Sequence, residues 1–360
     1  MPEVTIPGLT NGQLYGFRMF PRNMKNQFQT EIDMGTAEAT PTDRTTVTSR
    51  GQVGTYPWGS ATGVLGTSAG YAYAVLASGQ RNSSRTNNAY AFNEDFVHSN
   101  TQALMYYDSY GSTSDLPERG FLAYGSYGDS RTDQDVYTVN ANLQYQQIVN
   151  TRVSDQHPPT LGRCGEYMLF YPNGNGSAIA AITSDLVFSS AGTHGFSRHC
   201  ASSGGENGCV LASYTDDAIA FTPDLVMTAI SPASQNMTNV SQGIANETLY
   251  LMTTTGSGYA DSWTTDFVKS SNISFPYTAG NSNVPAARRL AEYAAFLGGF
   301  GSFGSNSVFV GPDGLTQTSA GTVAEGELAA ANVGNAVLYG TGYNPIGGAY
   351  YSALAAYSAS

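Results

Sequence analysis

Short runs of alternating small and large apolar residues recur along the chain, and each run leads into a break rich in Gly, Ser or Asn. The seven runs are Tyr71–Gly79, Gly120–Ser126, Glu166–Pro172, Gly208–Ser213, Thr248–Thr253, Tyr293–Gly299 and Asn335–Gly340. Their starts are separated by 49, 46, 42, 40, 45 and 42 residues, which is the spacing of four-stranded propeller blades and exceeds that of ankyrin or tetratricopeptide repeats. The pattern therefore predicts a repeat protein of seven similar units.

A second marker has the same spacing, because a further short strand and a polar turn closed by a large apolar residue follow six of the runs. These turns are Asp95-Phe96, Asn142-Leu143, Asp185-Leu186, Asp224-Leu225, Asp266-Phe267 and Asp313-Gly314-Leu315. Asp and Asn suit turns because their short side chains bond the nearby backbone and tolerate left-handed geometry. We interpret these acidic residues as turn residues rather than catalytic groups.

The last unit has fewer strands than the others, since it runs Ser352–Tyr357 and the sequence ends at Ser360. Two segments of strand character, Arg44–Ser49 and Ala61–Leu65, precede the first complete unit. We expect both to pair with the C-terminal hairpin, so that N- and C-terminal strands close one blade and no sheet edge is left open.

Composition supports an all-β fold. The chain has 41 Gly, 24 Tyr and 16 Phe but only 12% charged residues, and no window has the pattern of a long helix. The nearest exception, Ala286–Phe296, is expected where an outer strand passes into the next inner one. Residues 42–360 are thus predicted to form a seven-bladed β-propeller. Six or eight blades stay open because the outer strands are poorly defined in the sequence.

The first 41 residues differ from the rest and predict a short N-terminal β segment. Val4–Ile6, Leu14–Phe20 and Gln29–Thr40 have the character of three strands joined by turns. The segment resembles the last three strands of a fibronectin type III module, with GLTNGQLY at the position of that family's tyrosine corner. Two explanations of this partial module are open: a longer protein has been cut here, or a neighbouring chain completes it.

The repeated pattern also resembles a known group of propellers. The pattern consists of a strand ending in GG or GS, a polar loop, a second strand and then T-x-D-L, and Ala-rich segments such as Leu328–Tyr343 lead into the strands. It is similar to that of kelch-like propellers of phage tail and baseplate proteins. The Gly pair is intact only at Gly298-Gly299, and the Arg and Trp positions of cellular kelch repeats are not evident. The resemblance implies a virion protein that faces the extracellular medium rather than a cytoskeletal adaptor.

That resemblance implies a non-enzymatic display platform whose loops bind a host-surface glycan or protein. Other virion tail proteins are expected as further partners, and a homo-oligomer is left open. A structural spacer between virion parts and a propeller glycosidase or depolymerase are the alternatives. Candidate ligand-binding residues are the aromatics after the first strand of each blade: Tyr127, Tyr214, Tyr259, Phe300, Phe303 and Tyr343. Aromatic rings cover apolar sugar faces, but recurrence at equivalent positions also fits packing between blades.

Charge limits the choice of partner. A formal net charge of −12 disfavours nucleic acid and anionic membranes, and no apolar run approaches a membrane span. No cofactor is expected. A calcium site is left open at Asp129, Asp133 and Asp135, although their spacing matches no calcium loop and favours a solvated acidic loop.

The motifs that carry chemistry elsewhere are weak in this chain. Ser68 lies in a G-x-S-x-G pattern, but a strand is expected after it where a nucleophile elbow needs a helix. The stretch with His194, His199, Cys200 and Cys209 lacks zinc-ligand spacing, and we expect buried thiols there, with Cys209 as a small apolar residue in a strand. Neither catalytic nor metal-binding residues are predicted.

Overall fold

The computed structural model describes twenty stretches of the chain. They are residues 15–18, 36–39, 47–55, 65–81, 84–103, 110–125, 133–152, 159–172, 178–196, 200–213, 217–230, 240–245, 248–253, 259–270, 273–274, 286–300, 306–311, 316–320, 329–344 and 349–359. Within them every regular element is a strand, and no helix suitable for crossing a membrane occurs. The chain divides into two compact units, one covering Met1–Val47 and one covering Thr48–Ala359.

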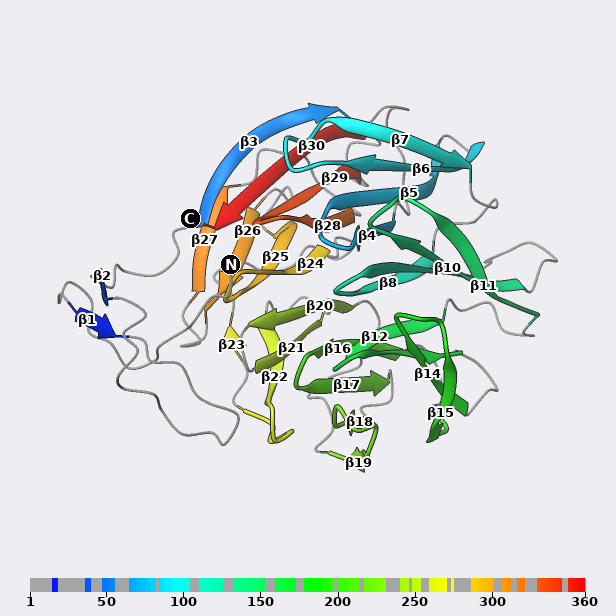
Figure 1. Ribbon diagram of the computed structural model, residues 1–360. Helices are drawn as coiled ribbons and strands as arrows, with labels where there is room; N and C mark the ends of the chain where they lie inside the picture. Colours follow the sequence, from blue (N-terminus) through cyan, green and yellow to red (C-terminus); the bar gives the residue numbers. More distant parts are fainter. Residues whose placement is uncertain are drawn as a thin grey trace. The chain divides into compact units, whose positions relative to one another are not determined.

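The described residues of the larger unit form seven antiparallel sheets of four strands each (Figure 1). The first is β4 (Leu65–Ala69), β5 (Tyr73–Arg81), β6 (Ser84–Phe92) and β7 (His98–Ala103). The second is β8 (Tyr110–Leu116), β9 (Arg119–Gly125), β10 (Asp133–Asn140) and β11 (Tyr145–Arg152). The third is β12 (Thr160–Cys164), β13 (Tyr167–Tyr171), β14 (Ala178–Thr183) and β15 (Phe188–Thr193).

The remaining sheets repeat this order of strands. The fourth is β16 (Cys200–Gly205), β17 (Gly208–Ser213), β18 (Ala218–Phe221) and β19 (Met227–Ala229). The fifth is β20 (Val240–Ala245), β21 (Thr248–Thr253), β22 (Tyr259–Thr264) and β23 (Ile273–Ser274). The sixth is β24 (Ala286–Leu290), β25 (Tyr293–Phe300), β26 (Asn306–Val310) and β27 (Thr316–Ala320). The seventh combines β28 (Ala329–Val333), β29 (Ala336–Asn344), β30 (Ala349–Ala359) and β3 (Val47–Thr55).

The first strands of the sheets contact one another in a closed circle. β4 contacts β8, β8 contacts β12, and the sequence continues through β16, β20 and β24 to β28, which contacts β4 again. Closed circles of radial four-stranded sheets leave only short, protected edges. This arrangement is a β-propeller. The predicted all-β propeller fold is therefore confirmed.

The sheet that closes the circle differs from the prediction in one strand. Three strands come from the C-terminal end of the chain and only one, β3, from the N-terminal end. Arg50 Nε on β3 donates a hydrogen bond to Ser358 Oγ on β30 at 2.9 Å. The expectation that Ala61–Leu65 would also join this sheet is wrong, because Leu65 begins β4, the innermost strand of the first sheet.

The apolar runs turn out to be the second strand of each sheet rather than the first. The innermost strand is a segment rich in Gly, Ala and Ser that precedes the run, and Ala286–Leu290, expected at a junction between blades, is such a strand (β24). Small residues are required here because neighbouring sheets approach closely. A Cβ atom on Gly204 would lie 1.9 Å from the Arg163 carbonyl oxygen, and one on Gly66 would lie 2.2 Å from the Ala330 carbonyl oxygen.

Second and third strands supply the core between the sheets. Leu169 and Tyr171 of the third sheet pack with Leu211 and Phe221 of the fourth, all of them buried. Alternate residues of one strand face the two neighbouring sheets, so the strand Tyr167–Tyr171 also sends Met168 toward the second sheet. The third sheet is thus apolar on both faces, as a radial arrangement requires.

The polar turns before the outermost strands have an unexpected backbone. Asp or Asn is expected to adopt the left-handed conformation in these turns. The large apolar residue that follows adopts it instead. These left-handed residues are Phe96, Leu143, Leu186, Leu225 and Phe267, with φ between 57° and 65°. The first turn residue fixes the loop; in the first sheet Asn93 Oδ1 accepts hydrogen bonds from the amides of Asp95 and Val97 at 3.1 and 2.9 Å.

The N-terminal unit contains one described pair of strands. β1 (Tyr15–Arg18) pairs antiparallel with β2 (Thr36–Ala39), within two of the three predicted segments. The third segment, Val4–Ile6, lies outside the described residues. Its fibronectin-like identity stays a prediction.

Candidate functional site

One position recurs near the end of every innermost strand, and it is a polar residue in five of the seven sheets. It lies one residue before the end of the strand, at the hairpin turn that leads to the second strand. The residues at this position are Ser68, Asp115, Arg163, Gly204, Ile244, Arg289 and Asn332 in sheet order. Because the innermost strands form the closed circle, this position recurs around the propeller axis, and we call the set the axial ring.

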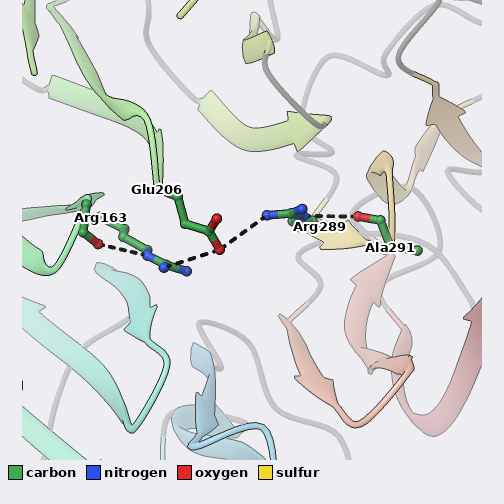
Figure 2. Close-up of polar contacts among 5 residues, drawn as sticks. Arg163, Glu206, Arg289 and Ala291 are labelled. Carbon is green, nitrogen blue, oxygen red and sulfur yellow. Dashed lines mark hydrogen bonds and ion pairs between the residues drawn. The ribbon is translucent and has the colours of Figure 1, made fainter. Parts of the chain in front are cut away.

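Two arginines of the axial ring meet at one carboxylate (Figure 2). Arg163 on β12 and Arg289 on β24 lie on opposite sides of Glu206, which occupies the β16–β17 turn. Glu206 Oε1 is 3.6 Å from Arg163 Nη2 and 3.9 Å from Arg289 Nη1. The third, fourth and sixth sheets are thereby joined by ion pairs, and the pair to Arg289 spans sheets that are not neighbours.

Both guanidinium groups are held in the same way. Arg163 Nε donates to the carbonyl oxygen of Gly165 at 3.2 Å, and Arg289 Nε donates to that of Ala291 at 3.0 Å. In each case the acceptor lies two residues further along, in the hairpin turn. Because each Nε is bonded to the backbone, the terminal guanidinium nitrogens of both arginines are directed at Glu206. Each arginine is thus oriented by the hairpin that carries it.

A third arginine crosses between sheets beside this pair. Arg288 Nη2 donates to Thr113 Oγ1 on β8 at 2.8 Å and also to the Gly66 carbonyl oxygen on β4, while Nη1 donates to the Ala287 carbonyl oxygen at 2.7 Å. Arg288 therefore connects the sixth sheet with the first and second. Burial lowers the pKa of its guanidinium, while Asp115 opposes that shift.

Asp115 and Tyr71 form a coupled pair next to Arg288. Burial raises the pKa of the Asp115 carboxyl, and the charge of Arg288 and a hydrogen bond from the Tyr71 hydroxyl oppose the increase. The Asp115 charge and burial raise the pKa of the Tyr71 hydroxyl. Tyr71 (φ 55°) lies in the turn between β4 and β5, which are paired at Ala69 and Tyr73. This turn is one residue longer than the two-residue turns that join the first and second strands of the other sheets.

Charges of both signs gather in and beside the axial ring. Three guanidinium groups, Arg163, Arg288 and Arg289, lie with two carboxyl groups, Asp115 and Glu206, and the neighbouring hairpin turns carry Glu118, Glu166 and Glu292. Asn332 adds an amide that donates to the Arg289 carbonyl oxygen. Such an arrangement can hold a single anionic group by paired, charge-assisted hydrogen bonds.

The predicted aromatic residues lie elsewhere. Tyr127, Tyr214 and Phe303 fall outside the described residues. Tyr259 begins β22, Phe300 ends β25, and Tyr343 lies one residue before the end of β29. In backbone position these three are at the strand ends opposite the hairpin turns of the axial ring. The structure therefore does not bring them to the arginine pair, and their binding role stays a prediction.

The candidate calcium residues are not a solvated loop in their described part. Asp135 lies in β10 and is 1% exposed. Gln147 Nε2 donates to its Oδ1 at 2.9 Å, whereas Oδ2 has no partner among the described residues. Burial raises the pKa of this carboxyl. Asp133 begins β10, Asp129 lies outside the described residues, and no group of three metal-ligating side chains occurs in the part of the chain that is described.

The weak sequence motifs have structural explanations. Ser68 is buried, its Oγ accepts the Tyr71 amide at 3.0 Å, and strand β5 follows, so a nucleophile elbow is not formed. Cys209 is buried in β17, as predicted for a small apolar residue. Cys164 is also a buried free thiol, and burial raises its pKa to about 12.

The axial ring was missed at the sequence level because the innermost strands were not recognised. Once the small-residue segments are aligned on their hairpin turns, one column contains Asp115, Arg163, Arg289 and Asn332. Charged and amide residues in one column of otherwise small residues are the signal that would have found the site.

Comparisons with known proteins support the fold alone. No family model matches the chain, and no curated protein matches it either. A solved structure of YjhT has a TM-score of 0.51 at 10% identity, with 74% of this chain and 99% of that one covered. Virginiamycin B lyase from Staphylococcus aureus has a TM-score of 0.55 at 11% identity, with 87% and 99% covered. Both are propeller proteins, and the second is named as an enzyme, so enzymes exist on this fold.

Proposed function

We propose that this protein is a non-enzymatic recognition module of a phage tail or baseplate, in which a kelch-like propeller binds a glycan or protein of the host surface. The observation that carries the proposal is the axial ring, where Arg163 and Arg289 are oriented by their own hairpins toward one anionic group. Strands from all seven sheets hold that position, so the binding groups are supported by the whole circle.

The state of Asp115 supports recognition over catalysis. A general acid or base must be able to exchange its proton with a substrate. Asp115 instead accepts the Tyr71 hydroxyl and is attracted by Arg288, which is bonded to three other groups. These partners favour a structural role for this carboxyl in fixing the turn that carries Tyr71. Glycosidase activity at the axial ring is the competing proposal.

A second candidate, a contact between virion parts, is favoured by one separate observation. Large apolar side chains are exposed directly after the polar turns of four sheets: Val97 (58%), Val187 (61%), Phe188 (47%), Val226 (58%), Met227 (37%) and Val268 (63%). The four valines follow the left-handed turn residue of the first, third, fourth and fifth sheets. Exposed apolar arcs of this kind suit contacts with other proteins, including other tail proteins or further copies of the chain.

The experiment that tests recognition is binding of the purified full chain to a glycan array and to intact host cells, with the products examined by mass spectrometry. The proposal predicts saturable binding with no released sugar. Released sugar would establish the glycosidase. Absence of binding by a folded chain would favour the contact function, and a Val187→Ser, Val226→Ser, Val268→Ser variant that no longer assembles with tail proteins would then support it.

A further inference from the structure

We infer that the arginine pair of the axial ring is a receptor for one sugar carboxylate, and that Glu206 occupies it as an internal substitute when no ligand is bound. This rests on the proposed function and names the ligand class of that site: a glycan that carries a hexuronic acid or a similar acidic sugar. The geometry of Glu206 is the starting point.

The contacts of Glu206 with the two arginines are long for a carboxylate between two guanidinium groups. Only one of its oxygens, Oε1, is near both guanidinium groups, and the two distances of 3.6 and 3.9 Å exceed those of charge-assisted hydrogen bonds. Its side chain is 67% exposed, whereas that of Arg163 is 13% exposed. Exposed ion pairs contribute little to stability. An external carboxylate can therefore displace Glu206 at small cost.

The arginines themselves are better fixed than the carboxylate that they meet. Their Nε atoms are engaged by backbone carbonyl oxygens, so the terminal nitrogens keep their direction when Glu206 leaves. A ligand carboxylate with two free oxygens could give one to each guanidinium group and shorten both contacts. Planar guanidinium groups favour such paired contacts, which lysine cannot reproduce.

A single carboxylate fits the surroundings better than a polyanion. The neighbouring hairpin turns carry Glu118, Glu166 and Glu292, so a dense negative ligand would meet repulsion close to the arginines. A sugar is favoured over a peptide C-terminus because a hydroxyl and an amide lie beside the arginines. The charges of Arg163 and Arg289 act on the Tyr71 hydroxyl, and Asn332 Nδ2 donates to the Arg289 carbonyl oxygen. The oxygens of both side chains can accept hydrogen bonds from sugar hydroxyls.

The test is calorimetric titration of the full chain with glucuronate, its methyl ester, glucose and glycylglycine at low and physiological salt. Glucuronate is expected to bind roughly tenfold or more tightly than the ester, which has the same sugar without the charge. Glu206→Gln should bind glucuronate about three- to tenfold more tightly because the internal competitor is removed. Glu166→Gln changes the net charge equally in a neighbouring turn but removes no internal competitor, so its gain should be clearly smaller than that of Glu206→Gln.

Arg289→Gln should weaken glucuronate binding roughly tenfold or more, and because this side chain is 43% exposed the variant is expected to fold. Equal binding of glucuronate and its ester, or no gain in Glu206→Gln relative to Glu166→Gln, would overturn the inference. Glycylglycine binding as tight as glucuronate would overturn the choice of a sugar. Host-cell binding without glucuronate binding would overturn this inference and leave the proposed function standing.

Discussion

At the scale of single residues, the most unusual feature is the left-handed backbone of five large apolar side chains. Left-handed geometry costs a non-glycine residue about 1–2 kcal/mol, and glycine or asparagine usually occupies it. Here the strained residue packs into the core between two sheets. Leu225, for example, contacts the cluster that contains Leu211 and Phe221. The side chain gains burial that a glycine could not provide, and this offsets the strain.

This account predicts an inverted order of stability at Leu225. Leu225→Ala and Leu225→Gly should both lower the free energy of unfolding, but the glycine variant should be the more stable of the two by about 1 kcal/mol because it relieves the strain. Leu211 on β17 is the matched control, since it lies in the same cluster with ordinary strand geometry. There the glycine variant should be less stable than the alanine variant by about 0.5–1 kcal/mol. Chemical denaturation measures all four, and the same order at both positions would contradict the account.

At the scale of strands, the innermost strands decide both the architecture and the site. They approach one another so closely that a methyl group on Gly204 would meet the Arg163 carbonyl oxygen at 1.9 Å. The same strands end in the axial ring. These strands are therefore short segments of mainly small residues with a few charged ones, and they have no apolar periodicity.

A test at this scale is the addition of one methyl group. Gly204→Ala should lower the free energy of unfolding by about 1–3 kcal/mol, as overpacking does, because the fourth sheet must move away from the third. Gly195→Ala is the control, since nothing lies within 4 Å of a Cβ atom there, and its effect should stay within about 0.5 kcal/mol. Thermal or chemical unfolding compares the two. Similar stability of both variants would show that the close approach at Gly204 is not limiting.

The same strands explain what the sequence could and could not predict. Second and third strands such as Tyr167–Tyr171 and Ala178–Thr183 are buried on both faces, so their apolar character is visible in the sequence and gave the repeat and the propeller fold. Innermost strands such as Cys200–Gly205 consist of small residues, and small residues have no distinctive periodicity. Arg163 and Arg289 therefore cannot be predicted from apolar periodicity, which indicates the aromatic residues after the apolar runs instead.

At the scale of the whole propeller unit, one strand from the beginning of the chain completes a sheet made by its end. β3 pairs with β30 as the outermost strand of the seventh sheet. At the inner end, β28 contacts β4, so the circle of innermost strands is closed and each residue of the axial ring has neighbours on both sides. Within this circle the ion pairs of Glu206 join the third, fourth and sixth sheets. The proposed recognition at the axis therefore uses groups from several sheets.

Binding to host cells by two variants, measured side by side with the wild type, tests the central claim that the ligand is recognised at the axial ring. Arg289→Gln alters the arginine pair, and Tyr127→Ala with Tyr214→Ala alters the aromatic residues predicted from the sequence. The account predicts that Arg289→Gln weakens binding roughly tenfold or more and that the double tyrosine variant binds as the wild type does. Unchanged binding by folded Arg289→Gln, with loss in the tyrosine variant, would contradict the account and move the recognition site to the loops.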